Sequence, residues 1–177
     1  MQESVISALL ALLFAFAGIN VIHQPAPQEK TAKVTEVVDG DTVEIMRNGE
    51  KDTVRVLGID TPEVHVENTP REFYLENTTE NMNCLEKIGE NASRLVKRKL
   101  AGEKVRIVRD PLSDRRGSYE RLLAYIEYNS TGLGKMLLEK GYARVYNSSF
   151  RRKSEYRAIE VESRRNNEGI WNESCSS

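Results

Sequence analysis

Two short acidic clusters carry the residue types that divalent-cation chemistry requires. They are Asp39-Gly40-Asp41-Thr42 and Asp60-Thr61-Pro62-Glu63, and each lies at the end of a predicted strand. We expect the turns to point these side chains at solvent, where hard oxygen ligands suit Ca²⁺ or Mg²⁺. The first cluster is not an EF-hand loop, because Val43 occupies the third ligand position and the required Glu is absent. An ordinary Asx-type turn is the alternative interpretation of this cluster.

Two arginines are candidates for binding phosphate. Arg55 lies in the strand that leads into Asp60, and Arg121 begins a later strand after a charged turn. A guanidinium group binds phosphate oxygens in a bidentate manner and stays charged at any relevant pH. For either arginine alone, a surface ion pair is the alternative. Of the tyrosines that could stack on bases, Tyr119 and Tyr146 fit that role better than residues in apolar stretches.

Length and composition limit the class of protein. The 177 residues suit one domain with a short appendage, and 30% charged with 39% hydrophobic residues is ordinary for a soluble globular domain. The formal net charge of -1 excludes a uniformly basic nucleic-acid-binding protein. Any phosphate binding must therefore come from a few placed arginines.

Hydrophobic periodicity and turn residues predict the elements that position these side chains. Asn48-Gly49 predicts a hairpin, and the polar stretch from Pro62 to Asn81 a long loop. We predict strands over 32–38, 42–46, 51–59, 105–108 and 121–128, helices over 85–100, 133–140 and 154–166, and an extended segment over 142–146. Three strands, a helix and two strands follow the order of an OB-fold. The predicted class is α+β, mainly β: a five-stranded OB barrel with about three packed helices, preceded by an N-terminal hydrophobic helix.

The N-terminal segment differs from the rest of the chain. Residues 5–22 are uncharged, which predicts a signal peptide or a membrane anchor over 1–22, with a buried core helix as the alternative. Ala15-Phe16-Ala17 fits a cleavage site, but no Lys or Arg precedes the apolar run, so cleavage stays open. A linker over 23–31, a domain over 32–171 and a tail over 172–177 complete the division. We expect a protein secreted or anchored at the outer face of the membrane, where this segment would meet the membrane or the export machinery.

Glycosylation sequons and cysteines agree with export. Sequons begin at Asn77, Asn91, Asn129, Asn147 and Asn172, although an Asn-rich composition is the alternative explanation. Asn147 is the weakest candidate for glycosylation, because a glycan beside Tyr146 would crowd a substrate there. The two cysteines, Cys84 and Cys175, could pair in an oxidising compartment, or they could be two free thiols.

Taken together, these residues resemble the staphylococcal nuclease (thermonuclease) family over about residues 32–171. Any one of the matching segments is weak, but their order and the spacing R-x-x-x-x-D-T-P-E from Arg55 to Glu63 are specific. The matching segments are Val38–Val43, Val54–Glu63, Tyr119–Ile126, Gly141–Val145 and Gly169–Trp171.

The resemblance implies a five-stranded OB barrel with three helices and a nuclease that leaves products ending in 3′-phosphate. It implies a Ca²⁺ ion held by the Asp41 and Asp60 carboxylates and the Thr61 carbonyl, with Asp39 in the outer shell. The remaining implied roles are Glu63 as general base, Arg55 and Arg121 as phosphate clamps, Tyr119 as a substrate contact and Tyr146 as the nearest match to a second one. The sequence departs from the family at Glu120, where Gly is usual, at Ser118, where Lys is usual, and in the loop 64–81.

We therefore predict a monomeric, calcium-dependent enzyme that hydrolyses DNA and RNA. A non-catalytic OB module that binds nucleic acid is the first alternative, and a metal-stabilised surface-layer or adhesion module is the second. Degenerate nuclease-like domains lose the acids or the arginines, whereas this chain keeps every one.

Overall fold

The computed structural model describes residues 30–172 together with Cys175. The apolar segment 1–22, and with it the expected signal peptide or anchor, lies outside these residues, as does nearly all of the linker. Over the described part of the chain, no helix is both long enough and apolar enough to cross a membrane.

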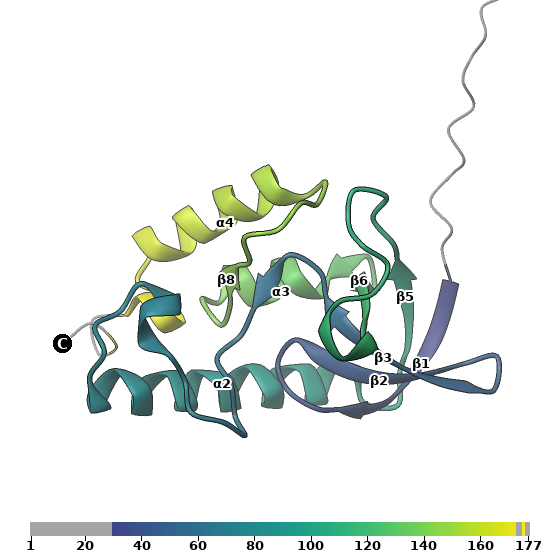
Figure 1. Cartoon of the computed structure of the whole chain (residues 1–177), viewed down its shortest axis with the longest axis horizontal. Coiled ribbons are helices and arrows are strands. Elements are labelled where there is room, and N and C mark those ends of the chain that lie inside the picture. The colour runs from purple at the N-terminus through teal and green to yellow at the C-terminus, as the bar shows by residue number, and fades with distance from the viewer. Residues whose placement is uncertain (1–29, 173–174, 176–177) are drawn as a thin grey trace, which may run out of the picture.

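Five strands close into a barrel (Figure 1). Their order is β3-β2-β1-β5-β6, and a parallel pairing between β3 and β6 closes the ring. The strands are β1 (Lys30–Val37), β2 (Thr42–Arg47), β3 (Glu50–Val56), β5 (Lys104–Val108) and β6 (Leu122–Tyr128). With its packed helices, this barrel confirms the predicted α+β class, mainly β, with an OB-like core.

Alternating apolar residues build the interior of the barrel. Val34, Val43, Ile45 and Val54 are fully buried, while the residues between them along each strand face outward or lie at the surface. The β2–β3 hairpin turns at Asn48-Gly49, as predicted, and both residues have positive φ angles of 53° and 84°.

Three α-helices pack on the barrel: α2 (Thr79–Leu100), α3 (Leu133–Glu139) and α4 (Lys153–Arg165). In Figure 1, α2 runs along one side of the molecule and α4 along the opposite side. Shorter elements complete the fold, namely the strands β4 (Ile59–Asp60), β7 (Thr131–Gly132) and β8 (Arg144–Val145) and the 3-10 helices η2 (Pro70–Phe73), η3 (Ser118–Glu120) and η4 (Gly169–Trp171).

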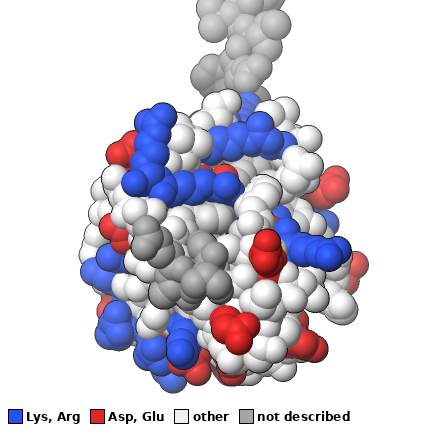
Figure 2. All heavy atoms as spheres, turned by 90° about the vertical axis from the view of Figure 1, so that its left-hand side faces the viewer, with Lys and Arg blue, Asp and Glu red and all other residues white. Residues whose placement is uncertain are grey.

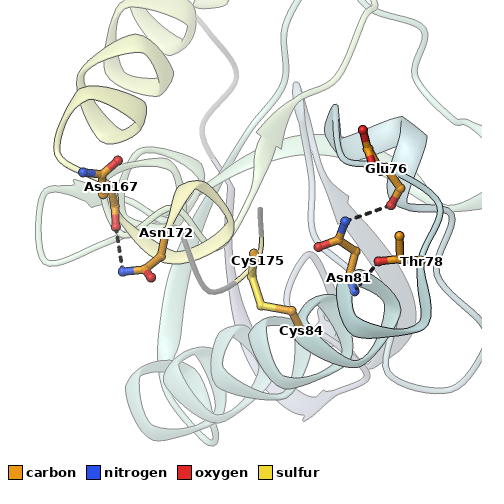
Figure 3. The surroundings of a disulfide bond; sticks show 7 residues. All are labelled: Glu76, Thr78, Asn81, Cys84, Asn167, Asn172 and Cys175. Carbon is orange, nitrogen blue, oxygen red and sulfur yellow. Dashed lines mark hydrogen bonds between the residues drawn. A yellow bond between two sulfur atoms is a disulfide. The ribbon is translucent and has the colours of Figure 1, made fainter. Parts of the chain in front are cut away.

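Helix α2 begins at Thr79, earlier than the predicted Leu85. Thr78 caps it, because its side-chain oxygen accepts a hydrogen bond from the Asn81 backbone N–H at 3.2 Å (Figure 3). The Asn81 side chain donates to the Glu76 carbonyl at 2.9 Å. The first turns of the helix are polar, so hydrophobic spacing detects it only from Leu85 onward.

The predicted third strand, 51–59, is divided in two. Gly58 has a φ of +86°, which turns the chain out of the barrel between β3 and β4. Strand β4 then pairs with β8 in a separate small sheet, with Asp60 opposite Arg144. This break moves the second acidic cluster to the side of the barrel.

A disulfide joins Cys84 on α2 to Cys175 beyond η4, with the two Cα atoms 5.5 Å apart (Figure 3). The Cα spacing lies within the usual range for a disulfide. Cys175 is buried in a small second core, which consists of Phe73, Leu85, Ile88, Ile170 and Cys175. Cys175 is thereby tied to the first turns of α2.

Candidate active site

One cleft of about 1120 Å³ collects most of the residues singled out in the sequence. It lies where β3, β4, the loop before β6 and the segment around β8 meet. Six predicted site residues line it: Arg55, Asp60, Glu63, Tyr119, Arg121 and Tyr146. Asp41 and Thr61 are buried beneath this lining.

Arg55 links the two acidic clusters. It lies on β3, where its Nη1 bonds to Asp41 Oδ1 at 2.8 Å and its Nη2 bonds to Asp60 Oδ1. Its side chain remains 18% exposed, so the guanidinium group reaches the cleft while it holds both carboxylates. One guanidinium group therefore contacts both buried acids.

Asp41 does not face solvent, which corrects the prediction from the turn pattern. It is only 1% exposed. Its Oδ2 accepts a hydrogen bond from the Thr61 backbone N–H at 3.1 Å, and its Oδ1 accepts one from Thr42 Oγ1 at 2.9 Å. Asp39, in the preceding turn, accepts from the Asp41 backbone N–H at 3.0 Å. The carboxylate is buried because it ties the two acidic turns together.

Burial raises the pKa of the Asp41 carboxyl to about 7. The charges of Asp39 and Asp60 act in the same direction, Arg55 and the Thr61 N–H lower the pKa, and the value of about 7 is the balance of all these effects. Burial therefore outweighs the stabilisation of the carboxylate by Arg55 and favours the protonated form.

Glu63 stands at the edge of the cleft on a backbone that is held firmly. Its N–H donates to Asn68 Oδ1 at 2.8 Å, and the Asn68 side chain donates back to the Glu63 carbonyl at 3.0 Å. Burial and the charges of Asp39 and Asp60 raise the pKa of the Glu63 carboxyl, while Arg55 and Arg121 lower it. Asn68 was not singled out in the sequence, because an Asn in a polar loop carries no signal of burial.

Tyr119 and Arg121 come from the loop around η3. Tyr119 is 90% exposed, and the Arg121 guanidinium carbon lies 5.4 Å from the centre of its ring. Arg121 Nε donates to the Ser118 carbonyl at 3.3 Å. The loop presents an aromatic ring and a charge side by side at one wall of the cleft.

Arg144 is a site residue that sequence reasoning missed. Its Nη2 lies 2.7 Å from Asp60 Oδ2 and 3.3 Å from Glu72 Oε2, and its guanidinium group lies over the rings of Phe73 and Tyr146. The side chain is 12% exposed. Its position between the buried residues Ala143 and Val145 was the available signal, but the sequence gives no indication of the β4–β8 pairing that brings it to Asp60.

The oxygen donors fit a hard divalent cation. Asp41 and Asp60 converge on Arg55, and the Thr61 N–H bonds to Asp41, so two carboxylates and the Thr61 peptide lie in one region. These oxygen donors around Arg55 do not include a third acidic side chain. Throughout residues 30–172, no group of three or more His, Cys, Asp or Glu residues is placed to hold a metal.

The sequon asparagines are distributed over the surface. Asn77, Asn129, Asn147 and Asn172 are exposed, while Asn91 is half-buried in α2 and its Oδ1 accepts from Arg94 at 2.7 Å. Asn147 lies next to the cleft residues Tyr146 and Ser148. The Asn172 side chain donates to the Asn167 carbonyl at 3.3 Å (Figure 3).

Comparison with known proteins identifies the family of this chain. The family described as staphylococcal nuclease homologue matches residues 53–173. An uncharacterized protein of Methanocaldococcus jannaschii is 41% identical over 146 residues, which cover 79% of this chain and 70% of that protein. Endonuclease YncB of Bacillus subtilis is 34% identical over 83% of this chain and 65% of its own length, and a thermonuclease of Staphylococcus hyicus is 29% identical over 81% and 76%. The chain belongs to the staphylococcal nuclease family.

Proposed function

We propose that the protein is a calcium-dependent nuclease that hydrolyses DNA and RNA to products ending in 3′-phosphate. Family membership and the nuclease names of two relatives support phosphodiester hydrolysis. The observation that carries the proposal is the convergence of Arg55, Glu63 and Arg121 on one cleft beside a pair of acids.

Different residues of the cleft have different roles in the proposed hydrolysis. A bound divalent cation, held by Asp41, Asp60 and the Thr61 carbonyl, would polarise a phosphoryl oxygen. Arg55 and Arg121 bind the phosphate and stabilise the charge that grows on its oxygens. Glu63 orients a water and accepts its proton while the water oxygen bonds to phosphorus. The bond between phosphorus and the 5′-oxygen breaks, and the 5′-oxygen leaves with a proton from solvent. Burial raises the pKa of Glu63, which makes the carboxylate a stronger base, and Arg55 and Arg121 act in the opposite direction and favour the ionised form.

The charge distribution fits local rather than global recognition of phosphate. Figure 2 shows the face that carries the start of α2 and the end of α4, where basic and acidic side chains are mixed. With a formal net charge of -1, the chain provides no overall field that attracts nucleic acid. The arginines of the cleft and the exposed rings of Tyr119 and Tyr146 supply the contacts instead.

We further propose that the protein acts outside the cell, either secreted or anchored by its N-terminal segment, as a monomer. The uncharged stretch over residues 5–22 and the five sequons support export. A disulfide agrees with an oxidising compartment.

Degradation assays test the proposed chemistry. The purified protein is incubated with DNA and RNA in CaCl₂ or in chelator, and wild-type cleavage should require the cation. Arg55→Ala and Arg121→Ala should each lower kcat by about 10²- to 10³-fold. Glu63→Gln should lower kcat more than it changes KM, because it keeps the shape and removes the base.

Arg98→Ala is the matched control, because Arg98 is an exposed arginine on α2 and does not line the cleft. It should retain wild-type activity. If the protein binds nucleic acid but does not cleave it, the nuclease proposal is wrong and the protein is a non-catalytic binding module.

A further inference from the structure

The loop that presents Tyr119 and Arg121 has a backbone that its residues do not favour. Tyr119 and Glu120 have φ angles of 59° and 57°, and both carry a Cβ, which makes this left-handed region costly. Two consecutive residues of this kind do not hold such a shape by themselves. Contacts from elsewhere in the fold must fix it.

Arg116 supplies those contacts. Its Nη1 and Nη2 each lie 3.0 Å from one carboxylate oxygen of Asp52 on β3. The same Nη1 donates to the backbone carbonyl of Glu120, inside the left-handed segment. The guanidinium group therefore bridges the barrel wall and the strained peptide.

Both partners of Arg116 lie close in sequence to arginines that line the cleft. Asp52 and Arg55 are three positions apart on β3, so one strand carries both the anchor for the loop and the first phosphate-binding arginine. Pairing between β3 and β6 begins at Leu122, just after Arg121. Backbone bonds from Gly117 to Arg121 and from Leu123 to Arg115 close the base of the loop, and Arg116 holds its far side.

We propose that Arg116 is a positioning residue for the Tyr119–Arg121 wall of the cleft. Through Asp52 and the Glu120 carbonyl, it fixes the left-handed turn that directs the Arg121 guanidinium toward the phosphate. The inference rests on the proposed nuclease function. A surface ion pair with no such role is the competing explanation, since the Arg116 side chain is 33% exposed.

A double-mutant cycle separates the two explanations. Arg116→Ala should lower kcat/KM by about 10- to 100-fold, because misplacing a transition-state donor by about 1 Å has an effect of this size. The same substitution in an Arg121→Ala background should change kcat/KM by less than about 3-fold, because the group that it positions is already absent. Arg116→Lys keeps the charge but loses the bidentate fork, so it should lie between Arg116→Ala and the wild type.

Arg115→Ala is the matched control. It removes the same charge from the adjacent residue, whose side chain lines a different cavity with Lys30 and Arg109. It should leave kcat/KM within about 2-fold of the wild type, because it removes neither contact of Arg116. Circular dichroism shows whether each variant is folded. If Arg116→Ala is not folded, Asp52→Asn replaces it in the test, because it weakens the same ion pair and should lower kcat/KM in the same way.

The outcomes are distinct. A wild-type protein without nuclease activity would overturn the proposed function itself. An active wild type with an unaffected Arg116→Ala variant would overturn the positioning role alone. An equal loss with and without Arg121, or an equal loss in Arg115→Ala, would assign Arg116 a general electrostatic or structural role instead.

Discussion

Asp41 combines burial, charge and a functional position in a single side chain. Its pKa of about 7 lies above the ordinary value of 3.8, so the folded protein binds this proton more tightly than the unfolded chain does. Between about pH 4 and pH 7, this residue therefore lowers the stability of the metal-free protein as pH rises. Above pH 7 the carboxylate is ionised in both the folded and the unfolded protein, and its full destabilising effect on the folded state is present.

Asp41→Asn should remove this pH dependence. In chelator, the free energy of unfolding of the variant relative to the wild type should rise from pH 5 to pH 8, as measured by urea denaturation. Added Ca²⁺ should stabilise the wild type more at pH 8 than at pH 5, because the ion competes with the proton. It should not stabilise the variant. An equal calcium response of both proteins at pH 8 would contradict the assignment of Asp41 as a ligand.

Glu120 occupies a backbone conformation that suits glycine, with a φ of +57°. Glu120→Gly should therefore raise the free energy of unfolding by up to about 1 kcal/mol and leave nuclease activity equal or higher. Glu120→Ala is the control, since it removes the carboxylate but keeps the strained Cβ. If thermal melting shows an equal gain in stability for both variants, the loss of the carboxylate charge, rather than the relief of backbone strain, explains the gain.

At the scale of elements, helix α2 supports the turn that carries Glu63. A Cβ built on Gly89 would lie 2.5 Å from the Pro62 carbonyl oxygen, so only glycine lets the helix approach this closely. Gly89→Ala should thus lower stability by about 1–3 kcal/mol, although alanine is the better helix former. It should also reduce kcat, since the displaced turn carries Glu63. Lys87→Ala on the exposed side of the same helix should change neither quantity.

The elements also show how far sequence reasoning extends. Barrel strands and the Asn48-Gly49 hairpin were predictable because local periodicity and turn chemistry determine them. Arg55 and Glu63 were identified because their spacing within one segment is specific. Asp41 was wrongly expected at the surface, because its burial depends on Arg55 and Thr61, which are distant in sequence. Arg144 was missed for the same reason, since its partners Asp60 and Glu72 are distant in sequence. Asn68 was missed because an Asn in a polar loop gives no signal of burial, although its partner Glu63 is only five residues away.

At the scale of the whole molecule, the Cys84–Cys175 disulfide joins residues separated by 91 positions and closes a loop that contains α2 from Cys84 onward, the barrel strands β5 and β6, α3 and α4. The small core of Phe73, Leu85, Ile88 and Ile170 surrounds it. In the chain-entropy description, a loop of this size stabilises the folded state by about 4–5 kcal/mol. The packing of Ile170 and Cys175 against Leu85 and Ile88 already restricts the same segment, so the measured effect should be smaller.

The double variant Cys84→Ser, Cys175→Ser should lower the free energy of unfolding by about 2–4 kcal/mol, as measured by urea denaturation. Reductant should destabilise the wild type by a similar amount and leave the double variant unchanged, which separates loss of the cross-link from other effects of reductant. At a temperature where both proteins are folded, kcat should be the same, because neither cysteine lines the cleft. A large fall in kcat without a fall in stability would instead show that the cross-link sets the position of α2 under Pro62 and Glu63.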